Sequence, residues 1–287
     1  MENQEIIILV SIIAVISLIV LKIYTYVKAR HLREIGYTYV YYYMKNCDQL
    51  SYYRNKSHHI NKYSSSFIEL NEHKDKWYLS FGSKNVIKEM VEFYIEANTF
   101  TLSVSNMFQL SHYFSYSECK SFDGAISSLE ASMKNIVKNE FRSFIYKQTG
   151  ERDLYDFPRK IDYCHNLEQN RQVHNKEVVE KELNDNKDFF DTVLKYPLDA
   201  QQRESIVKLE DNCLVISSAG SGKTSTSIAK VKYLLEKKNY KKEEILVVSY
   251  NRKTAEEFQE RLDVPGLTCK TFHALALSII GKVEGKR

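Results

Sequence analysis

The segment Ser217–Thr224, which reads SSAGSGKT, constrains the fold of this chain more than any other segment. A short apolar run, Cys213–Ile216, precedes it and a helical pattern follows it, so the expected order is strand, tight turn and helix. Glycine at positions 220 and 222 allows positive φ, which turns backbone N–H groups inward toward an anion. The N-terminus of the following helix adds a favourable dipole. The segment therefore predicts a phosphate-binding loop.

Two side chains of this loop suit a nucleoside triphosphate with its magnesium ion. Lys223 would reach the β- and γ-phosphates, and Thr224 would offer its hydroxyl to Mg²⁺. Upstream, Gln202 lies in the proline-led helix start Pro197–Ser205 (PLDAQQRES), where its amide could contact an adenine edge. The alternative for Gln202 is a polar residue on a solvated helix face.

Strand and helix patterns alternate after the loop. Glu244–Tyr250 (EILVVSY) predicts a buried strand, and Asn251–Leu262 predicts an amphipathic helix. Leu267–Lys270 predicts another short strand, and Thr271–Ile280 opens a further helix. Together with the strand before the loop, this order predicts an α/β fold with a parallel sheet.

These segments resemble the Q motif and motifs I, Ia and Ib of UvrD/Rep-type superfamily 1 DNA helicases. Gln202, SSAGSGKT, SYNRKTAEEFQERL and TFHALALSII occur in the family's order, and the likeness is greatest to the DNA helicase IV group. The resemblance covers Asp188 to about Lys282. It implies part of a RecA-like P-loop NTPase domain, belonging to an ATP-dependent motor that moves 3′ to 5′ along single-stranded DNA. Ser217 and Ser218 depart from the family pattern, in which alanine and glycine are usual.

The resemblance also implies roles for individual residues. Lys223 and Thr224 would be catalytic, and Thr224 would also bind Mg²⁺. ATP would be held by Gln202, Ala219, Gly220, Ser221, Gly222, Lys223, Thr224 and Ser225. The DNA strand would lie beside Tyr250, Asn251, Arg252, Lys253, Thr271, Phe272 and His273.

The residue types at the DNA positions suit that partner. Tyr250 and Phe272 follow predicted strands and can stack on bases, a contact worth about 1 to 3 kcal/mol per base and indifferent to sequence. Residues 251–253 lie at a helix N-terminus, where amide and cationic side chains meet backbone phosphate. The alternative for the two aromatic residues is packing under a helix, and for His273 it is capping or packing.

ATP hydrolysis also needs an acidic D-E-x-x strand and an arginine finger. Neither pattern occurs before Arg287. We therefore expect the front part of a longer helicase, truncated before these motifs, that binds ATP without hydrolysing it efficiently. The alternative is a membrane-tethered, non-enzymatic nucleotide- or DNA-binding protein or a remnant. A P-loop kinase is disfavoured by Gln202 and by the SYNRKTAEEF element.

An apolar run near the N-terminus predicts a single membrane-spanning helix. Ile6–Leu21 contains no charge, and if Lys22 reaches the surface the run continues to Val27, about the 20 residues that span a bilayer. Acidic residues precede the run, and it is followed by Lys22, Lys28, Arg30 and Arg33. The positive-inside rule then places the N-terminus outside and the rest in the cytoplasm. The alternative is a buried core helix.

The region between anchor and motor predicts a small α+β or mainly helical accessory domain of unknown task. It is rich in tyrosine, with strand-like runs at Trp77–Phe81 and Phe100–Val104 and amphipathic helices near Asn85–Asn98 and Asp123–Tyr146. Leu167–Leu194 predicts a long polar helix. The predicted domains are an anchor (1–30), an accessory domain (31–165), a connecting helix (166–196) and the front of the ATP-binding domain (197–287).

Bulk composition adds little. The net charge of +4 suits a polyanionic partner only weakly. The five cysteines are scattered without a C-x-x-C pair, which favours reduced thiols over disulfides or a zinc site.

Overall fold

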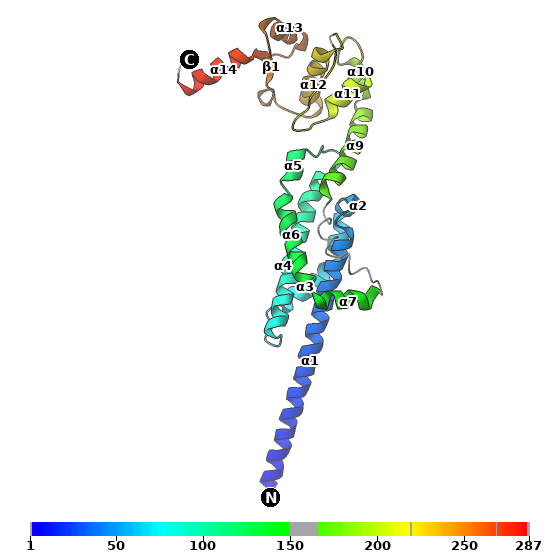
Figure 1. Ribbon diagram of the computed structural model, residues 1–287, viewed down its shortest axis with the longest axis vertical. Helices are drawn as coiled ribbons and strands as arrows, with labels where there is room; N and C mark the ends of the chain where they lie inside the picture. The colour runs from blue at the N-terminus through cyan, green and yellow to red at the C-terminus, as the bar shows by residue number, and fades with distance from the viewer. Residues whose placement is uncertain (1, 150–165, 219, 268, 286–287) are drawn as a thin grey trace. The chain divides into compact units, whose positions relative to one another are not determined.

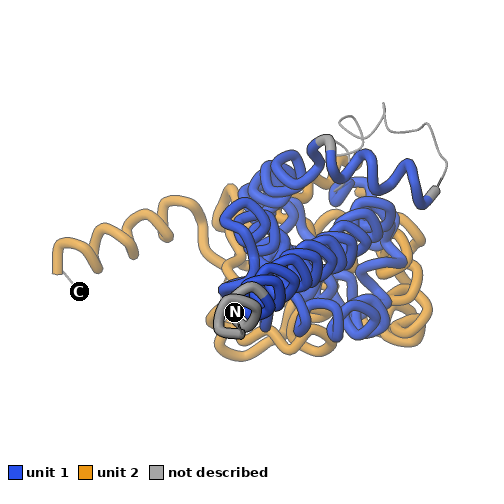
Figure 2. The backbone as a smooth tube through the Cα atoms, turned by 90° about the horizontal axis from the view of Figure 1, so that it is seen from below, with its two compact units in different colours: residues 1–174 blue, residues 175–287 orange. Residues whose placement is uncertain are grey.

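The computed structural model describes residues 2–149, 166–218, 220–267 and 269–285. The chain divides into two compact units, residues 1–174 (unit 1) and residues 175–287 (unit 2) (Figure 2). The boundary falls inside helix α9, Leu167–Asp185. The described residues are mostly helical, with one small parallel sheet in unit 2.

The described residues of unit 1 form helices and turns and no strand, so the strands predicted for the accessory region are wrong. Phe100–Val104 lies within α4, and residues 77–80 form a turn that leads into that helix. Ala97, Phe100 and Val104 are all buried, and their spacing continues a helical face that outweighs the β-propensity of single residues. The helices are α1 (Glu2–Asn46), α2 (Leu50–Arg54), α3 (Lys56–His73), α4 (Phe81–Met107), α5 (Tyr116–Lys120), α6 (Asp123–Ile136) and α7 (Asn139–Thr149), followed by the first part of α9.

The tyrosine-rich stretch supplies the core of unit 1. Tyr43 is fully buried and meets Phe93 edge to face, with ring centroids 5.4 Å apart. The hydroxyl of Tyr53 donates to the carbonyl of Cys47 at 2.6 Å, so this buried polar group is satisfied. Aromatic pairs of this kind stabilise a core beyond the area that they bury.

The helix predicted over Asp123–Tyr146 is interrupted. The N–H of Lys138 donates to the carbonyl of Ile136 at 2.8 Å, and Val137 has φ −76° and ψ 59°, which is an inverse γ-turn. The turn keeps Met133 of α6 and Phe141 of α7 buried in the same core. The apolar stripe is therefore shared by two helices.

The apolar part of α1 has no cover within unit 1. Residues 9–24 are all exposed, and Figure 1 shows the N-terminal part of the helix extending alone beyond the bundle. This segment is long and apolar enough to cross a membrane, which confirms the predicted apolar helix. The alternative of a buried core helix does not hold in unit 1.

Unit 2 contains two parallel strands where the sequence predicts three. Strands β1 (Val247–Ser249) and β2 (Cys269–Thr271) pair in parallel, with Ser249 opposite Thr271. The predicted strand Cys213–Ile216 does not form. Among the described residues β1 pairs with β2 alone, so this run has no neighbouring strand with which to form hydrogen bonds. Leu214 and Ile216 are accordingly exposed. The helices of unit 2 are the end of α9, α10 (Lys187–Thr192), α11 (Ala200–Val207), α12 (Lys223–Lys237), α13 (Arg252–Leu262) and α14 (Phe272–Val283).

The predicted connecting helix is also divided, since α9 ends at Asp185 and α10 begins at Lys187. Near the end of α9, the carboxylate of Glu182 accepts hydrogen bonds from Lys238 and from the hydroxyl of Tyr233. Burial opposes ionisation of Glu182, but these two donors hold its pKa below its ordinary value. The end of α9 is thereby attached to the end of α12.

Helices α1 and α4 pack closely at Gly36. A Cβ atom added to Gly36 would lie 2.1 Å from Sδ of Met90 and 3.3 Å from its Cβ. We expect Gly36→Leu to lower the free energy of unfolding by about 1–3 kcal/mol, because overpacking displaces both helices. The near-ultraviolet circular dichroism of the buried tyrosines, followed during thermal unfolding of the full chain, measures this effect.

Gly124→Leu is the matched control, because nothing lies within 4 Å of a Cβ at that helical glycine. We expect this variant to be neutral or slightly stabilised, since leucine is the better helix former. Equal losses in the two variants would contradict the close contact between α1 and α4.

Candidate functional site

The loop before α12 has the backbone conformation that its glycines permit. Gly220 has φ 77° and Gly222 has φ 87°, both in the left-handed region. The hydroxyl of Ser221 donates to the carbonyl of Ser218 at 2.7 Å and closes the turn. Ala219 lies outside the described residues. The helix follows at once, because Gly222 is the N-cap of α12.

Lys223 bends back over this loop. Its Nζ donates to the carbonyl oxygens of Ser217 at 2.9 Å and Ser218 at 2.7 Å. Thr224 is half-buried, and its hydroxyl forms no hydrogen bond within the described residues. Two left-handed glycines, an ammonium group and a free hydroxyl at a helix N-terminus are a donor set that fits a polyphosphate and Mg²⁺.

Gln202 contacts the loop directly. Its Nε2 donates to the carbonyl of Ser221 at 3.2 Å, and its Oε1 accepts from the N–H of Asp199 at 3.0 Å. Asp199 in turn accepts from the N–H of Gln202, so the pair forms a capping box at the start of α11. Gln202 is therefore half-buried against the loop rather than on a solvated face.

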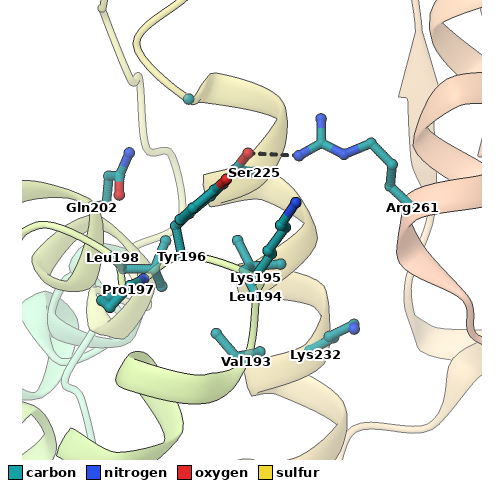
Figure 3. A pocket seen from close by; sticks show the side chains of 11 residues that line it. Val193, Leu194, Lys195, Tyr196, Pro197, Leu198, Gln202, Ser225, Lys232 and Arg261 are labelled. Carbon is teal, nitrogen blue, oxygen red and sulfur yellow. Dashed lines mark hydrogen bonds between the residues drawn. The ribbon is translucent and has the colours of Figure 1, made fainter.

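A cavity of about 510 Å³ opens beside the loop (Figure 3). Arg261 reaches into it from α13 and donates from Nη2 to Oγ of Ser225 at 2.7 Å. Three of the residues that line it are cationic and none is acidic. The residues that line the cavity are Val193, Leu194, Lys195, Tyr196, Pro197, Leu198, Gln202, Gly222, Ser225, Lys232 and Arg261.

Sequence reasoning missed most of this cavity. Arg261 reads only as part of an amphipathic helix, and its approach to Ser225 depends on how α13 packs on α12. Tyr196 was the better signal, because it lies six residues before Gln202 and is therefore positioned near it by connectivity alone.

The predicted DNA residues gather at one edge of the sheet. Because β1 and β2 are parallel and Ser249 is opposite Thr271, Tyr250 and Phe272 both follow the carboxyl ends of their strands. Tyr250 is 89% exposed and Phe272 is 61% exposed, so neither packs under a helix. Arg252 and Lys253 are exposed in the first turn of α13.

Side chains other than His273 cap the two helices that begin at this edge. Oδ1 of Asn251 accepts from the N–H of Thr254 at 2.8 Å and caps α13. Oγ1 of Thr271 accepts from the N–H of Ala274 at 3.2 Å and caps α14. His273 is exposed.

Lys230 joins the helix that carries Gln202 to the helix that follows the loop. Its Nζ donates to the carbonyls of Ile206 at 2.6 Å and Lys208 at 2.7 Å, at the C-terminal end of α11. These are carbonyls that a helix end leaves without an intrahelical partner. Burial lowers the pKa of Lys230 to about 8.

Comparison with known proteins identifies this part of the chain. Residues 198–285 match the family model of the UvrD/REP helicase N-terminal domain. The resemblance to UvrD/Rep-type helicases is confirmed. Among curated proteins, the chain is similar to DNA helicase IV of Escherichia coli K12, with 41% identity over 118 residues, which are 40% of this chain and 17% of that protein.

We call residues 198–285, which match the family model, the UvrD-like segment. Two further relatives match shorter stretches of the chain. ATP-dependent DNA helicase Rep of Escherichia coli K12 is 33% identical over 29% of this chain and 13% of its own length. DNA helicase II of Salmonella typhimurium LT2 is 33% identical over 28% of this chain and 12% of its own length. The chain thus spans less than a fifth of the length of these relatives. No solved structure matches it.

The two glycines of the loop, Gly220 and Gly222, provide a matched pair of variants. Alanine at either position would be strained by about 1–2 kcal/mol, because both backbones are left-handed. A Cβ at Gly222 would also lie 2.7 Å from Nε2 of Gln202, whereas nothing lies within 4 Å at Gly220. We therefore expect Gly222→Ala to lower the free energy of unfolding more than Gly220→Ala, as measured by urea denaturation.

Adding Gln202→Ala to the Gly222→Ala variant should remove the extra loss of unfolding free energy relative to Gly220→Ala, because the colliding amide is gone. If the excess persists in the double variant, the contact between Gln202 and the loop is not its cause.

The pKa of Lys230 predicts a pH dependence. Below about pH 8 the folded and unfolded states both carry the proton, so the cost of burying the charge is fully present. Between about pH 8 and 10.5 the unfolded state binds more protons, so the free energy of unfolding rises with pH. We expect this rise in the wild type and its loss in Lys230→Met, measured by urea unfolding across that range. Lys237→Met, at an exposed lysine of the same helix, should keep the rise; identical pH profiles in wild type and Lys230→Met would contradict the assignment.

Proposed function

We propose that the UvrD-like segment is the ATP- and single-stranded-DNA-binding front part of a 3′–5′ DNA helicase motor. The observation that carries this proposal is the loop at Gly220 and Gly222, with Lys223 at the start of α12, inside a segment that matches the family model. ATP with Mg²⁺ is the cofactor that this family uses. Hydrolysis by the complete motor is part of the same proposal.

The nucleotide site is assembled from the loop and the cavity beside it. Lys223 would exchange its two carbonyl acceptors for phosphate oxygens, and Thr224 would turn its hydroxyl to Mg²⁺. Gln202 and the cationic cavity would receive the remainder of the nucleotide. The cations Lys195, Lys232 and Arg261 line the same cavity, and their positive charge would favour the triphosphate beside it.

The DNA strand would lie across the carboxyl ends of β1 and β2. Tyr250 and Phe272 are exposed for base stacking, and Arg252 and Lys253 can meet phosphate. Helix α13 begins at this edge, and near its other end Arg261 binds Ser225 beside the phosphate loop. One rigid helix therefore connects the two sites, so that nucleotide binding can bias the DNA edge.

The apolar part of α1 is proposed as a single-pass membrane anchor. Its residues 9–24 are exposed, and the basic residues that follow it favour the cytoplasm for the remainder of the chain. The N-terminus would then lie outside. A motor held in this way would act on DNA close to the membrane.

Nucleotide binding is tested with the full chain in mild detergent, using a fluorescent ATP analogue and Mg²⁺. We expect Lys223→Ala to weaken binding by roughly 10- to 100-fold, because charge-assisted hydrogen bonds contribute about 1.5–3 kcal/mol. Lys237→Ala removes the same charge from the far end of α12 and should bind normally. Unchanged nucleotide binding by Lys223→Ala would show that the loop is not part of the nucleotide site.

The same preparation tests the DNA partner by fluorescence anisotropy of a labelled oligonucleotide. Removing Tyr250 and Phe272 by alanine substitution should weaken binding, whereas Tyr240→Ala, at an exposed tyrosine before β1, should not. Affinity for DNA that is the same with and without the ATP analogue would contradict the coupling through α13.

A further inference from the structure

The turn between α3 and α4, residues 74–80, lies at the end of unit 1 from which the apolar part of α1 emerges (Figure 1). Tyr24 of α1 meets Tyr78 of this turn edge to face, with ring centroids 6.1 Å apart. One helical turn further along α1, Nζ of Lys28 binds Oε1 of Glu69 in α3 at 2.8 Å. These contacts place the turn level with the end of the apolar segment.

The outer surface of this turn combines large apolar side chains with lysines. Trp77 is 74% exposed and Phe81, the first residue of α4, is 81% exposed. Residues 72–88 contain four lysines and two carboxylates, and one of the carboxylates, Asp75, is paired with Lys88 at 2.8 Å. We call Lys74, Lys76, Trp77, Phe81 and Lys84 the α3–α4 corner.

The outward direction of these aromatic side chains is imposed by the residues between them. Leu79 is buried in a cluster with Leu32 of α1 and Ile87 of α4, which holds the turn against both helices. Ser80 caps α4 by accepting from the N–H of Ser83 at 3.2 Å. A turn that is fixed in this way keeps Trp77 and Phe81 in solvent unless something outside the chain covers them.

The position of the corner matches one boundary of a bilayer. The apolar residues 6–27 form a helix about 33 Å long. The hydrocarbon core of a bilayer is about 30 Å thick, so a span would place the headgroups near Tyr24 and Lys28. That is the level of Tyr78 and the corner. Tryptophan at such an interface, with lysines facing anionic headgroups, is the usual arrangement in membrane proteins.

We propose that the α3–α4 corner inserts into the headgroup region of the bilayer beside the anchor and binds anionic lipid. The proposal rests on the membrane anchoring proposed above. It gives unit 1 two membrane contacts, α1 and the corner, and two contacts fix the tilt of a domain where one helix leaves it free to swing.

Trp77 is the only tryptophan of the chain, so its fluorescence reports on the corner alone. The full chain is reconstituted into vesicles of phosphatidylcholine with phosphatidylglycerol, with and without lipids brominated near the top of the acyl chain. We expect brominated lipid to quench Trp77 and aqueous iodide to quench it little. Replacing Lys74, Lys76 and Lys84 by glutamine should increase iodide quenching, most of all in vesicles that contain phosphatidylglycerol.

The control is Tyr116→Trp in a Trp77→Phe background, which moves the tryptophan to α5 at the other end of the bundle (Figure 1). This tryptophan should be quenched by iodide and not by brominated lipid. Circular dichroism checks that both variants are folded.

Quenching of Trp77 by iodide alone would overturn the proposal, and so would shielding from iodide without quenching by brominated lipid, which would indicate a protein partner. The anchor is tested separately, by retention of the chain in the vesicles during an alkaline wash. If the chain is retained in the vesicles but iodide quenches Trp77, the proposed insertion of the corner is wrong and the proposed anchor stands. Loss in the wash after quenching by brominated lipid overturns the anchor and supports the corner.

Discussion

Helix α12 is the element on which the contacts of unit 2 depend. Its first turn closes the loop before it through Lys223, which binds the carbonyl of Ser218, and Lys230 binds the carbonyls at the end of α11. Tyr233 holds the end of α9 through Glu182, while Ile228 and Val231 form a core with α13. Since these partners occupy successive turns of one rigid helix, the loop, Gln202 and Arg261 are held in a fixed relation to one another.

The parallel pairing of β1 and β2 has a different consequence. It places two exposed aromatic residues, Tyr250 and Phe272, at the same edge, although helix α13 separates them in the chain. Leaving such side chains in water contributes nothing to the stability of the fold. Their exposure suits the proposed DNA partner, because the bases of single-stranded DNA offer flat surfaces for stacking.

Unit 1 uses one helix for two purposes. The second half of α1 carries Tyr39 and Tyr43 into the core with α4, whereas its first half has no cover. The bundle therefore ends where the apolar segment begins. The α3–α4 turn lies at that end of the bundle, at the level of the proposed membrane boundary. A helix that is continuous through both parts transmits the position of the anchor to the bundle directly.

Local features of this protein were predictable from its sequence because they depend on neighbouring residues. The left-handed glycines at 220 and 222, the caps at Asn251 and Thr271, and helices α13 and α14 follow from side chains within a turn of one another. Features that need a distant partner were not predictable in this way. Cys213–Ile216 has the composition of a strand but forms none without a neighbouring strand, and Phe100–Val104 is helical because its face packs in the core. The contact of Arg261 with Ser225, and the level of Trp77 beside Tyr24, exist only because helices pack, and packing is decided by the whole chain at once.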